Sequence, residues 1–254
     1  MHESIAKAEI KGTFRKVNSE LDRFNEDVMA GAKNTRISKK GIQGYVNEIV
    51  SIYGNLLLVH ERKSKSSSWH FKSTIVAINP EHEKVKNIGE LHPFVFEHFD
   101  SKLFMKRKLG LHMYFEPPCY VHKHFLQRIK QRVEHSQSER LCQLLCSLVL
   151  WLADCKNLVG VDVSEFHVIT KHEILIITYH SDIEKYVFNT VLLRERFTQV
   201  QSECYEHYFE KLRYSKFDFI VMSPDTHESL FGKLDNVDVI QKVLKSTSFF
   251  ERSF

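Results

Sequence analysis

The sequence predicts an α+β fold with mostly antiparallel sheets, an N-terminal amphipathic helix and a central helical pair. Three observations lead to this prediction. Apolar residues recur at alternating spacings of four and three within residues 3–31, which places them on one helix face. A leucine-rich segment at residues 137–155 is apolar on most sides, as a core helix is. Three short apolar, β-branched runs follow one another between residues 164 and 193, as in an antiparallel meander.

The first part of the chain, residues 1–40, is predicted to be this helix and a polar, basic linker. Its apolar stripe consists of Ile10, Phe14, Val17, Leu21, Phe24 and Val28. The stripe covers barely three heptads, so we expect it to dock on the core of the protein. Contact with a partner helix, or a homodimer formed through this helix, is the alternative.

The second part, residues 41–118, is predicted to be a β-rich domain. The runs at residues 44–54, 55–62, 71–79 and 109–116 are rich in apolar and β-branched residues, which favour strands. A polar loop at residues 63–70 separates the second run from the third and indicates a hairpin with a long tip. Pro117 and Pro118 end the last run and mark the domain boundary.

The third part, residues 119–254, is predicted to be an α+β domain, although a single merged domain is an open alternative. A basic helix is expected at about residues 121–135. Ser136 and Glu139 match the capping-box pattern, which predicts the start of the core helix. Strands are expected at residues 164–170, 173–180 and 185–193, and helices at 194–213 and 237–246. The inward-facing residues expected on the first of these two helices are Phe197, Val200, Cys204, Phe209 and Leu212.

The composition indicates the cellular compartment in which the protein is expected. The chain of 254 residues contains five cysteines without a CxxC pair, which favours a reducing compartment. Its first residues contain no apolar signal-peptide core, and its longest apolar run, residues 145–153, is far shorter than the roughly 20 residues that span a bilayer. We therefore expect a cytoplasmic protein that does not bind membranes.

Positive charge is concentrated near the middle of the chain. Residues 102–140 contain nine Lys and Arg against three Glu, whereas the formal charge of the whole chain is only +4. A local basic patch is typical of a polyanion site. The nucleic-acid contacts expected besides the basic helix face are Lys106, Arg107, Lys108, Lys123, Lys130 and Trp69. A solvated helix face without a ligand would have the same composition.

Within the basic helix, His124, Arg128 and Arg132 follow one another at intervals of four and share one face. Arginine supplies paired donors for phosphate, and histidine transfers protons near neutral pH. Cleavage of RNA through its 2′-hydroxyl needs both functions and requires no metal. The candidate catalytic residues are therefore His124, Arg128 and Arg132. An ordinary amphipathic helix with a cationic solvent face is the alternative.

The HxxxRxxxR pattern from His124 to Arg132, followed by the meander, resembles small toxin-like domains related to the RelE/barnase-like ribonucleases. The resemblance covers about 70 to 90 residues of the second half. It implies that the His and Arg side chains lie over a sheet face and contact RNA. By the same resemblance, Thr190 or Tyr179 on the meander is expected to complete the site.

A second type of nuclease is suggested by Glu61 and Lys63 at the end of an apolar run. E-x-K in this position is part of a metal-dependent nuclease pattern, in which carboxylates bind Mg²⁺ and the lysine helps to position the nucleophile. Glu48 is the candidate for the earlier acid. The Asp that this pattern requires on a preceding strand is missing.

No group of His and Cys has zinc-ligand spacing, and nucleotide-binding and hydrolase signatures are absent, so we expect no metal and no cofactor. The sequence predicts a nucleic-acid-interacting protein, with RNA favoured over DNA, and leaves open whether it is a metal-independent ribonuclease. A non-catalytic protein-binding or regulatory factor, for example of a phage or mobile element, is the alternative.

Overall fold

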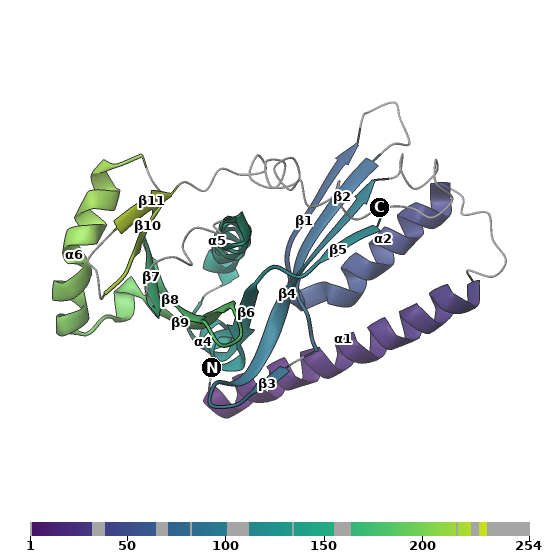
Figure 1. The fold of residues 1–254 in the computed structure, drawn as a ribbon, viewed down its shortest axis with the longest axis horizontal. Helices are drawn as coiled ribbons and strands as arrows, with labels where there is room; N and C mark the ends of the chain where they lie inside the picture. The colour runs from purple at the N-terminus through teal and green to yellow at the C-terminus, as the bar shows by residue number, and fades with distance from the viewer. Residues whose placement is uncertain are drawn as a thin grey trace. The chain divides into compact units, whose positions relative to one another are not determined.

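The computed structural model describes residues 2–31, 39–64, 71–81, 83–100, 112–133, 135–154, 164–216, 218–224 and 229–232. The chain divides into two compact units, His2–Pro117 and Pro118–Phe254. Helices and mostly antiparallel strands occur in both units, and the chain begins with a long helix, so the predicted α+β class is confirmed (Figure 1). The predicted linker at residues 33–40 falls largely, and the predicted helix at 237–246 entirely, outside the described residues.

In the first unit, helix α1 (Glu3–Gly31) buries four of the six residues of its predicted apolar stripe, Leu21 is partly buried, and the side chain of Val28 lies outside the described set. The buried residues are Ile10, Phe14, Val17 and Phe24, none of them more than 6% exposed. The ring of Phe14 lies 4.0 Å from that of His92, measured between centroids. The stripe is therefore part of the core of its own unit, which is the docking that we expected from its short length.

Residues 44–54 were predicted to be a strand, and this prediction is wrong. They belong to helix α2 (Lys39–Tyr53) and the 3₁₀ turn η1 (Gly54–Leu56). The buried residues Val46, Ile49, Ile52 and Tyr53 recur at spacings of three and four. This helical period outweighs the strand preference of individual β-branched residues, because burial of a continuous face stabilises a helix more than local propensity does.

The sheet of the first unit is antiparallel throughout its described pairings. Its strands are β1 (Leu57–Ser64), β2 (Phe71–Ile78), β3 (Glu83–Val85), β4 (Gly89–Asp100) and β5 (His112–Phe115). Strand β4 pairs with β2, β3 and β5, and β2 also pairs with β1. Residues 91–99 of β4 are all buried, and the hydroxyl of Tyr53 on α2 donates to Oε1 of Glu97 at 2.9 Å. Strand β4 is thus the central strand of this unit.

The second unit contains the predicted meander, which is confirmed. Its strands are β6 (Cys119–His122), β7 (Glu165–Thr170), β8 (Glu173–His180), β9 (Lys185–Leu193), β10 (Phe219–Met222) and β11 (Ser229–Gly232). Their order is β6-β9-β8-β7-β10-β11, and the β6–β9 pairing is parallel whereas the others are antiparallel. Strands β6, β10 and β11 were not predicted.

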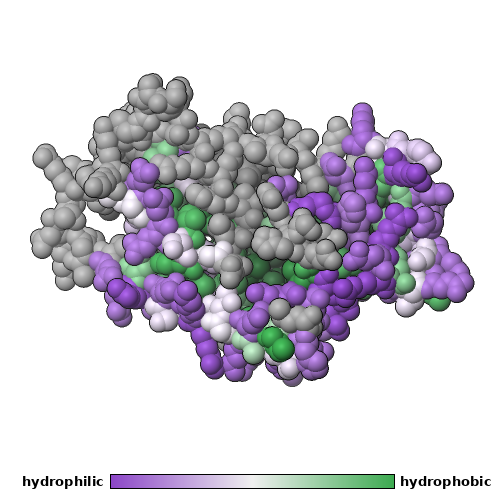
Figure 2. Space-filling model, turned by 180° about the vertical axis from the view of Figure 1, so that it is seen from behind, coloured by the Kyte–Doolittle hydropathy of each residue, from purple (hydrophilic) through white to green (hydrophobic). Residues whose placement is uncertain are grey.

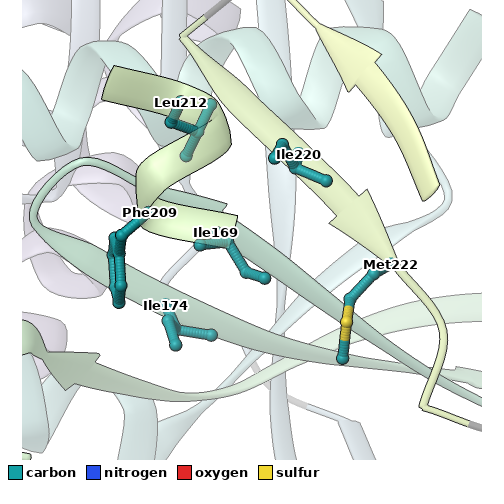
Figure 3. Packing of buried hydrophobic residues seen from close by; sticks show 6 residues of the cluster. All are labelled: Ile169, Ile174, Phe209, Leu212, Ile220 and Met222. Atoms are coloured by element: carbon teal, nitrogen blue, oxygen red, sulfur yellow. The ribbon is translucent and has the colours of Figure 1, made fainter. Parts of the chain in front are cut away.

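Helices cover both faces of this second sheet. They are α4 (Lys123–Arg132), α5 (His135–Asp154) and α6 (Gln199–Tyr214), and a 3₁₀ turn, η3 (Arg194–Arg196), precedes α6. Leu148 and Leu152 of α5 meet Val168 of β7. Phe209 and Leu212 of α6 pack with Ile169, which is the next residue of that strand (Figure 3). Since successive strand residues point to opposite faces, the sheet lies between α5 and α6.

Three predicted helix boundaries in this unit are wrong. The basic helix begins at Lys123 rather than near residue 121, because residues 119–122 pair with β9 as strand β6. Helix α5 begins at His135, so Ser136 lies inside its first turn and cannot be the N-cap. The third predicted helix is split: η3 comes first, and α6 begins only after Thr198, which forms a capping box with Gln201.

The inward face predicted for this third helix is correct in part. Phe209 and Leu212 are buried, but Val200 is 68% exposed and Cys204 is also exposed. The residues missed are Tyr205 and Tyr208, which pack against the buried cluster. Among the described residues the other exposed large hydrophobic side chains are Ile5 and Tyr214. Hydrophilic residues cover much of the described surface on the face drawn in Figure 2.

Candidate nucleic-acid interface

Helix α4 is held against strand β9 of the second sheet by its first turn. The side chain of His122 accepts a hydrogen bond from the backbone N–H of His124, which caps the helix N-terminus. Phe125 is fully buried, and its ring lies 5.9 Å from that of Phe188 on β9, measured between centroids. This anchor fixes the rotation of α4 about its axis and therefore the direction in which its polar face points.

The predicted His/Arg face of α4 is formed by side chains that contact one another. Nε of Arg128 donates to Nε2 of His124 at 3.0 Å, and Nη1 of Arg128 donates to Oε1 of Gln131 at 3.3 Å. His124, Arg128 and Gln131 are all partly buried. The acceptor role of Nε2 means that this nitrogen carries no proton in the observed arrangement.

Arg132, the third member of the face, is tied to the sheet: its Nη1 donates to the backbone oxygen of Val191 on β9 at 3.0 Å. Burial, followed by the charges of Arg128 and Arg196, holds the pKa of the Arg132 guanidinium below its ordinary value. The effect of Arg196 shows that η3 adds a third cation to this region. Sequence spacing gave no sign of it, because Arg196 lies far along the chain from α4.

A cleft of about 230 Å³ opens beside Arg132, and we call it the arginine cleft. Its lining residues are Arg132, Leu192, Leu193, Arg196, Phe197 and Gln201. Among the residues that the structure describes, two guanidinium groups and no carboxylate line it. Like charges held this close repel one another, and an anion bound between them would relieve the repulsion. The lining therefore has the chemistry of a phosphate site.

A second cleft, of about 500 Å³, lies next to the first and shares Leu193 with it. This His172 cleft is lined by Arg140, Lys171, His172, Glu173, Leu193, Arg194 and Glu195. The guanidinium of Arg140 donates to both carboxylate oxygens of Glu173, with Nη1 at 2.9 Å from Oε1. Nη2 of Arg194 donates to Oε1 of Glu206 at 3.0 Å. Much of the charge around this cleft is thus already compensated.

The ring of His172 lies in a positive local field. Its pKa is lowered by partial burial and by the charges of Arg140, Lys171 and Arg194, while Glu173 acts in the opposite direction. The imidazole is consequently neutral at pH 7. Neither this residue nor the cleft around it was predicted from the sequence.

The other predicted contacts are distributed as follows. Lys123 and Lys130 lie on α4, where Lys123 is half-buried and Lys130 exposed. Trp69, Lys106, Arg107 and Lys108 lie outside the described residues.

The two meander residues lie on opposite faces of the sheet. Thr190 pairs with Ile176 of β8, on the side that carries α6 and away from α4. Tyr179 pairs with Tyr186, with ring centroids 4.9 Å apart.

The residues of the metal-dependent alternative lie in the first unit. Glu61 and Lys63 pair with Thr74 and Lys72 across the β1–β2 ladder, but their side chains are outside the described set. Glu48 is exposed on α2. No group of three His, Cys, Asp or Glu side chains is arranged to hold a metal ion in the described parts of the chain.

A hydrogen-bonded chain on the α6 side of the sheet was also missed by sequence reasoning. Nε2 of His167 lies 2.7 Å from Oε1 of Glu165, and Nδ1 of His167 lies 2.8 Å from the hydroxyl of Tyr205. Burial, with Cys204, Glu165 and Tyr208, raises the pKa of Tyr205 to about 12. The phenol thus stays protonated at neutral pH, and the chain ties α6 to β7 rather than supplying a nucleophile.

Within the described residues, no helix combines the length and the apolar character needed to cross a membrane. Comparison with protein-family models, with curated proteins and with solved structures found no match to this chain. Any functional conclusion therefore depends on the chemistry of the clefts and of the α4 face.

Proposed function

We propose that the Pro118–Phe254 unit binds the phosphate backbone of RNA and cleaves it without a metal ion. The observation that carries the proposal is the arginine cleft, with Arg132 and Arg196 in its lining and Arg128 close enough to depress the pKa of Arg132. Guanidinium groups bind phosphate through paired, directional donors. A lining without carboxylates selects against cationic ligands.

His124 is the candidate proton acceptor, connected to this phosphate site through Arg128, which bonds to His124 and lies close enough to Arg132 to affect its pKa. Its Nε2 carries no proton while Arg128 donates to it. When a phosphate draws the Arg128 guanidinium away, Nε2 becomes available to take the proton of a ribose 2′-hydroxyl. The 2′-oxygen then attacks phosphorus, the bond from phosphorus to the 5′-oxygen breaks, and the leaving oxygen is protonated by water. The products are a 2′,3′-cyclic phosphate and a free 5′-hydroxyl.

The arginines would stabilise the negative charge that develops on phosphorus during this reaction. DNA lacks the 2′-hydroxyl, so the same site would bind single-stranded DNA without cutting it. The protein-binding alternative has less support from the geometry, because four residues of the α1 stripe through which it would act are buried in its own unit.

The test measures binding and cleavage of RNA, single-stranded DNA and duplex DNA, each with and without EDTA. We expect RNA affinity to fall steeply with salt. A plot of the logarithm of the association constant against the logarithm of the salt concentration should have a slope of roughly −0.7 for each phosphate contact. Arg196→Gln should make this slope shallower, whereas Lys211→Gln, an exposed cation on α6, should leave it unchanged. Failure of all three nucleic acids to bind would overturn the proposal.

Cleavage is judged separately from binding. We expect RNA cleavage to persist in EDTA and to be lost in His124→Ala, while that variant still binds RNA. Cleavage that survives in His124→Ala would refute the assigned role of His124. Activity abolished by EDTA would instead favour the metal-dependent alternative with Glu61 and Lys63.

A further inference from the structure

The His172 cleft differs in chemistry from the arginine cleft beside it. Its lining includes Glu173 and Glu195 as well as basic residues. Arg140 is engaged by Glu173, and Arg194 by Glu206. Two of its three cations are thus already engaged by carboxylates, so this cleft is less suited to a phosphate than the arginine cleft.

The size and the lining of the His172 cleft suit a neutral ring with hydrogen-bonding edges. Its volume of about 500 Å³ falls within the roughly 300–1,000 Å³ that is typical of small-molecule sites. Leu193 contributes an apolar part of the lining, the Glu195 carboxylate offers acceptors, and Lys171 offers donors. A nucleobase combines an apolar ring face with donors and acceptors on its edge.

Two planar groups at this cleft are placed to stack on such a ring. The imidazole of His172 is exposed and neutral, and imidazole and guanidinium planes are among the groups on which unpaired bases stack. The guanidinium of Arg194 is held in place by Glu206 and by the ring of Phe209, whose centroid lies 4.2 Å from its central carbon. These two contacts favour one orientation of the guanidinium plane before a ligand arrives.

We propose that the His172 cleft binds a nucleobase while the arginine cleft binds a phosphate of the same strand, so that the ligand is single-stranded RNA. This inference rests on the proposed function and defines its substrate. Leu193 lines both clefts, which places them side by side. A base that enters a cleft must be unpaired and unstacked, which a continuous duplex prevents.

The experiment compares a single-stranded oligoribonucleotide with a blunt RNA duplex of the same sequence, by fluorescence anisotropy at one fixed salt concentration. We expect the single strand to bind at least tenfold more tightly than the duplex. His172→Ala should weaken binding of the single strand about tenfold, as loss of one stacked base does, and leave duplex binding unchanged. His207→Ala, an exposed histidine on α6, is the matched control and should behave like the unaltered protein.

A second readout locates the two parts of the ligand. Adenosine monophosphate should shift the ring NMR signals of His172 upfield through stacking. Inorganic phosphate cannot stack and should not produce this upfield shift. Unchanged thermal unfolding of His172→Ala would confirm that it folds. Equal affinity for single strand and duplex, with no effect of His172→Ala, would overturn this inference and leave phosphate binding intact. Absence of any RNA binding would overturn both.

Discussion

Nε of Arg128 donates a hydrogen bond to Nε2 of His124 across one turn of α4, at 3.0 Å. Because the guanidinium can only donate, Nε2 must be the unprotonated acceptor and the neutral ring must carry its proton on Nδ1. The pair therefore fixes the tautomer of the proposed proton acceptor. It also makes the availability of Nε2 depend on where the Arg128 side chain lies.

Arg128→Ala should remove the restriction on the tautomer of the His124 ring. With the donor removed, Nε2 is free to carry the proton, and we expect the ring to redistribute between its two neutral tautomers. The ¹⁵N chemical shifts of the two ring nitrogens, recorded at pH 8, distinguish the two states directly. Arg213→Ala, at an exposed position on α6, serves as the control. Identical ring shifts in Arg128→Ala and in the unaltered protein would show that Arg128 does not hold the tautomer in solution.

The local part of this site could be predicted from the sequence, and the distant part could not. His124, Arg128 and Arg132 lie four residues apart, and helix geometry alone places such residues on one face. Arg196 reaches the same cleft only because β9 ends at Leu193 and η3 turns back beside it. Pairing between strands and helices decides such contacts, and no spacing within one sequence segment encodes them.

The same distinction explains the successes and errors in the fold. The meander was predicted because each of its strands has six to nine residues, enough for an apolar pattern to show, and its connections are of turn length, which are local signals. Helix α2 was missed because its β-branched residues favour strands individually, while its buried face has the period of a helix. The four-residue strand β10 is too short for a pattern to develop, and its place depends on pairing with β7.

The ion pair between Arg140 and Glu173 links α5 to the start of β8. The Glu173 side chain is only 1% exposed, whereas that of Arg140 is 36% exposed. Arg140→Leu leaves a buried carboxylate without its partner, and we expect it to lower the free energy of unfolding by about 1–3 kcal/mol. This range lies below that of a fully buried pair because Arg140 is partly solvated. Urea denaturation at pH 7 measures the change.

A double variant shows whether the loss comes from the uncompensated charge. Replacing both residues, Arg140→Leu with Glu173→Leu, removes the buried carboxylate as well, and the stability should recover part of the loss. If the double variant loses more free energy of unfolding than the two single variants lose together, the penalty of the unpaired Glu173 charge is not what destabilises Arg140→Leu.

Substitutions of Phe209 and Val200 test which face of α6 is buried against the sheet. Phe209 packs with Ile169, Ile174 and Ile220 in the buried cluster, whereas Val200 is 68% exposed (Figure 3). Phe209→Ala should lower the free energy of unfolding by about 3–5 kcal/mol, and Val200→Ala by less than about 0.5 kcal/mol. Chemical denaturation of the two variants provides the comparison. Comparable losses would mean that α6 is rotated relative to the arrangement described.

His98 on β4 should make the first unit sensitive to acid. Burial and the charge of Lys72 lower its pKa, while Asp100 raises it, and the net shift is downward. Its Nδ1 lies 2.9 Å from Oγ1 of Thr74. Because the folded pKa lies below the unfolded value of about 6.5, the unfolded chain takes up the proton first as the pH falls. The contribution of His98 to stability is therefore complete above about pH 6.5 and is lost as the pH falls towards and through the folded pKa.

The measurement compares the free energy of unfolding at pH 7.5 and pH 5.5 by urea denaturation. We expect His98→Gln to lose less stability than the unaltered protein over this interval, because glutamine does not titrate, even if it is less stable at both pH values. His2→Gln replaces an exposed histidine near the N-terminus and should retain the full pH dependence. An equal loss of stability in His98→Gln and His2→Gln would assign the acid sensitivity to other groups.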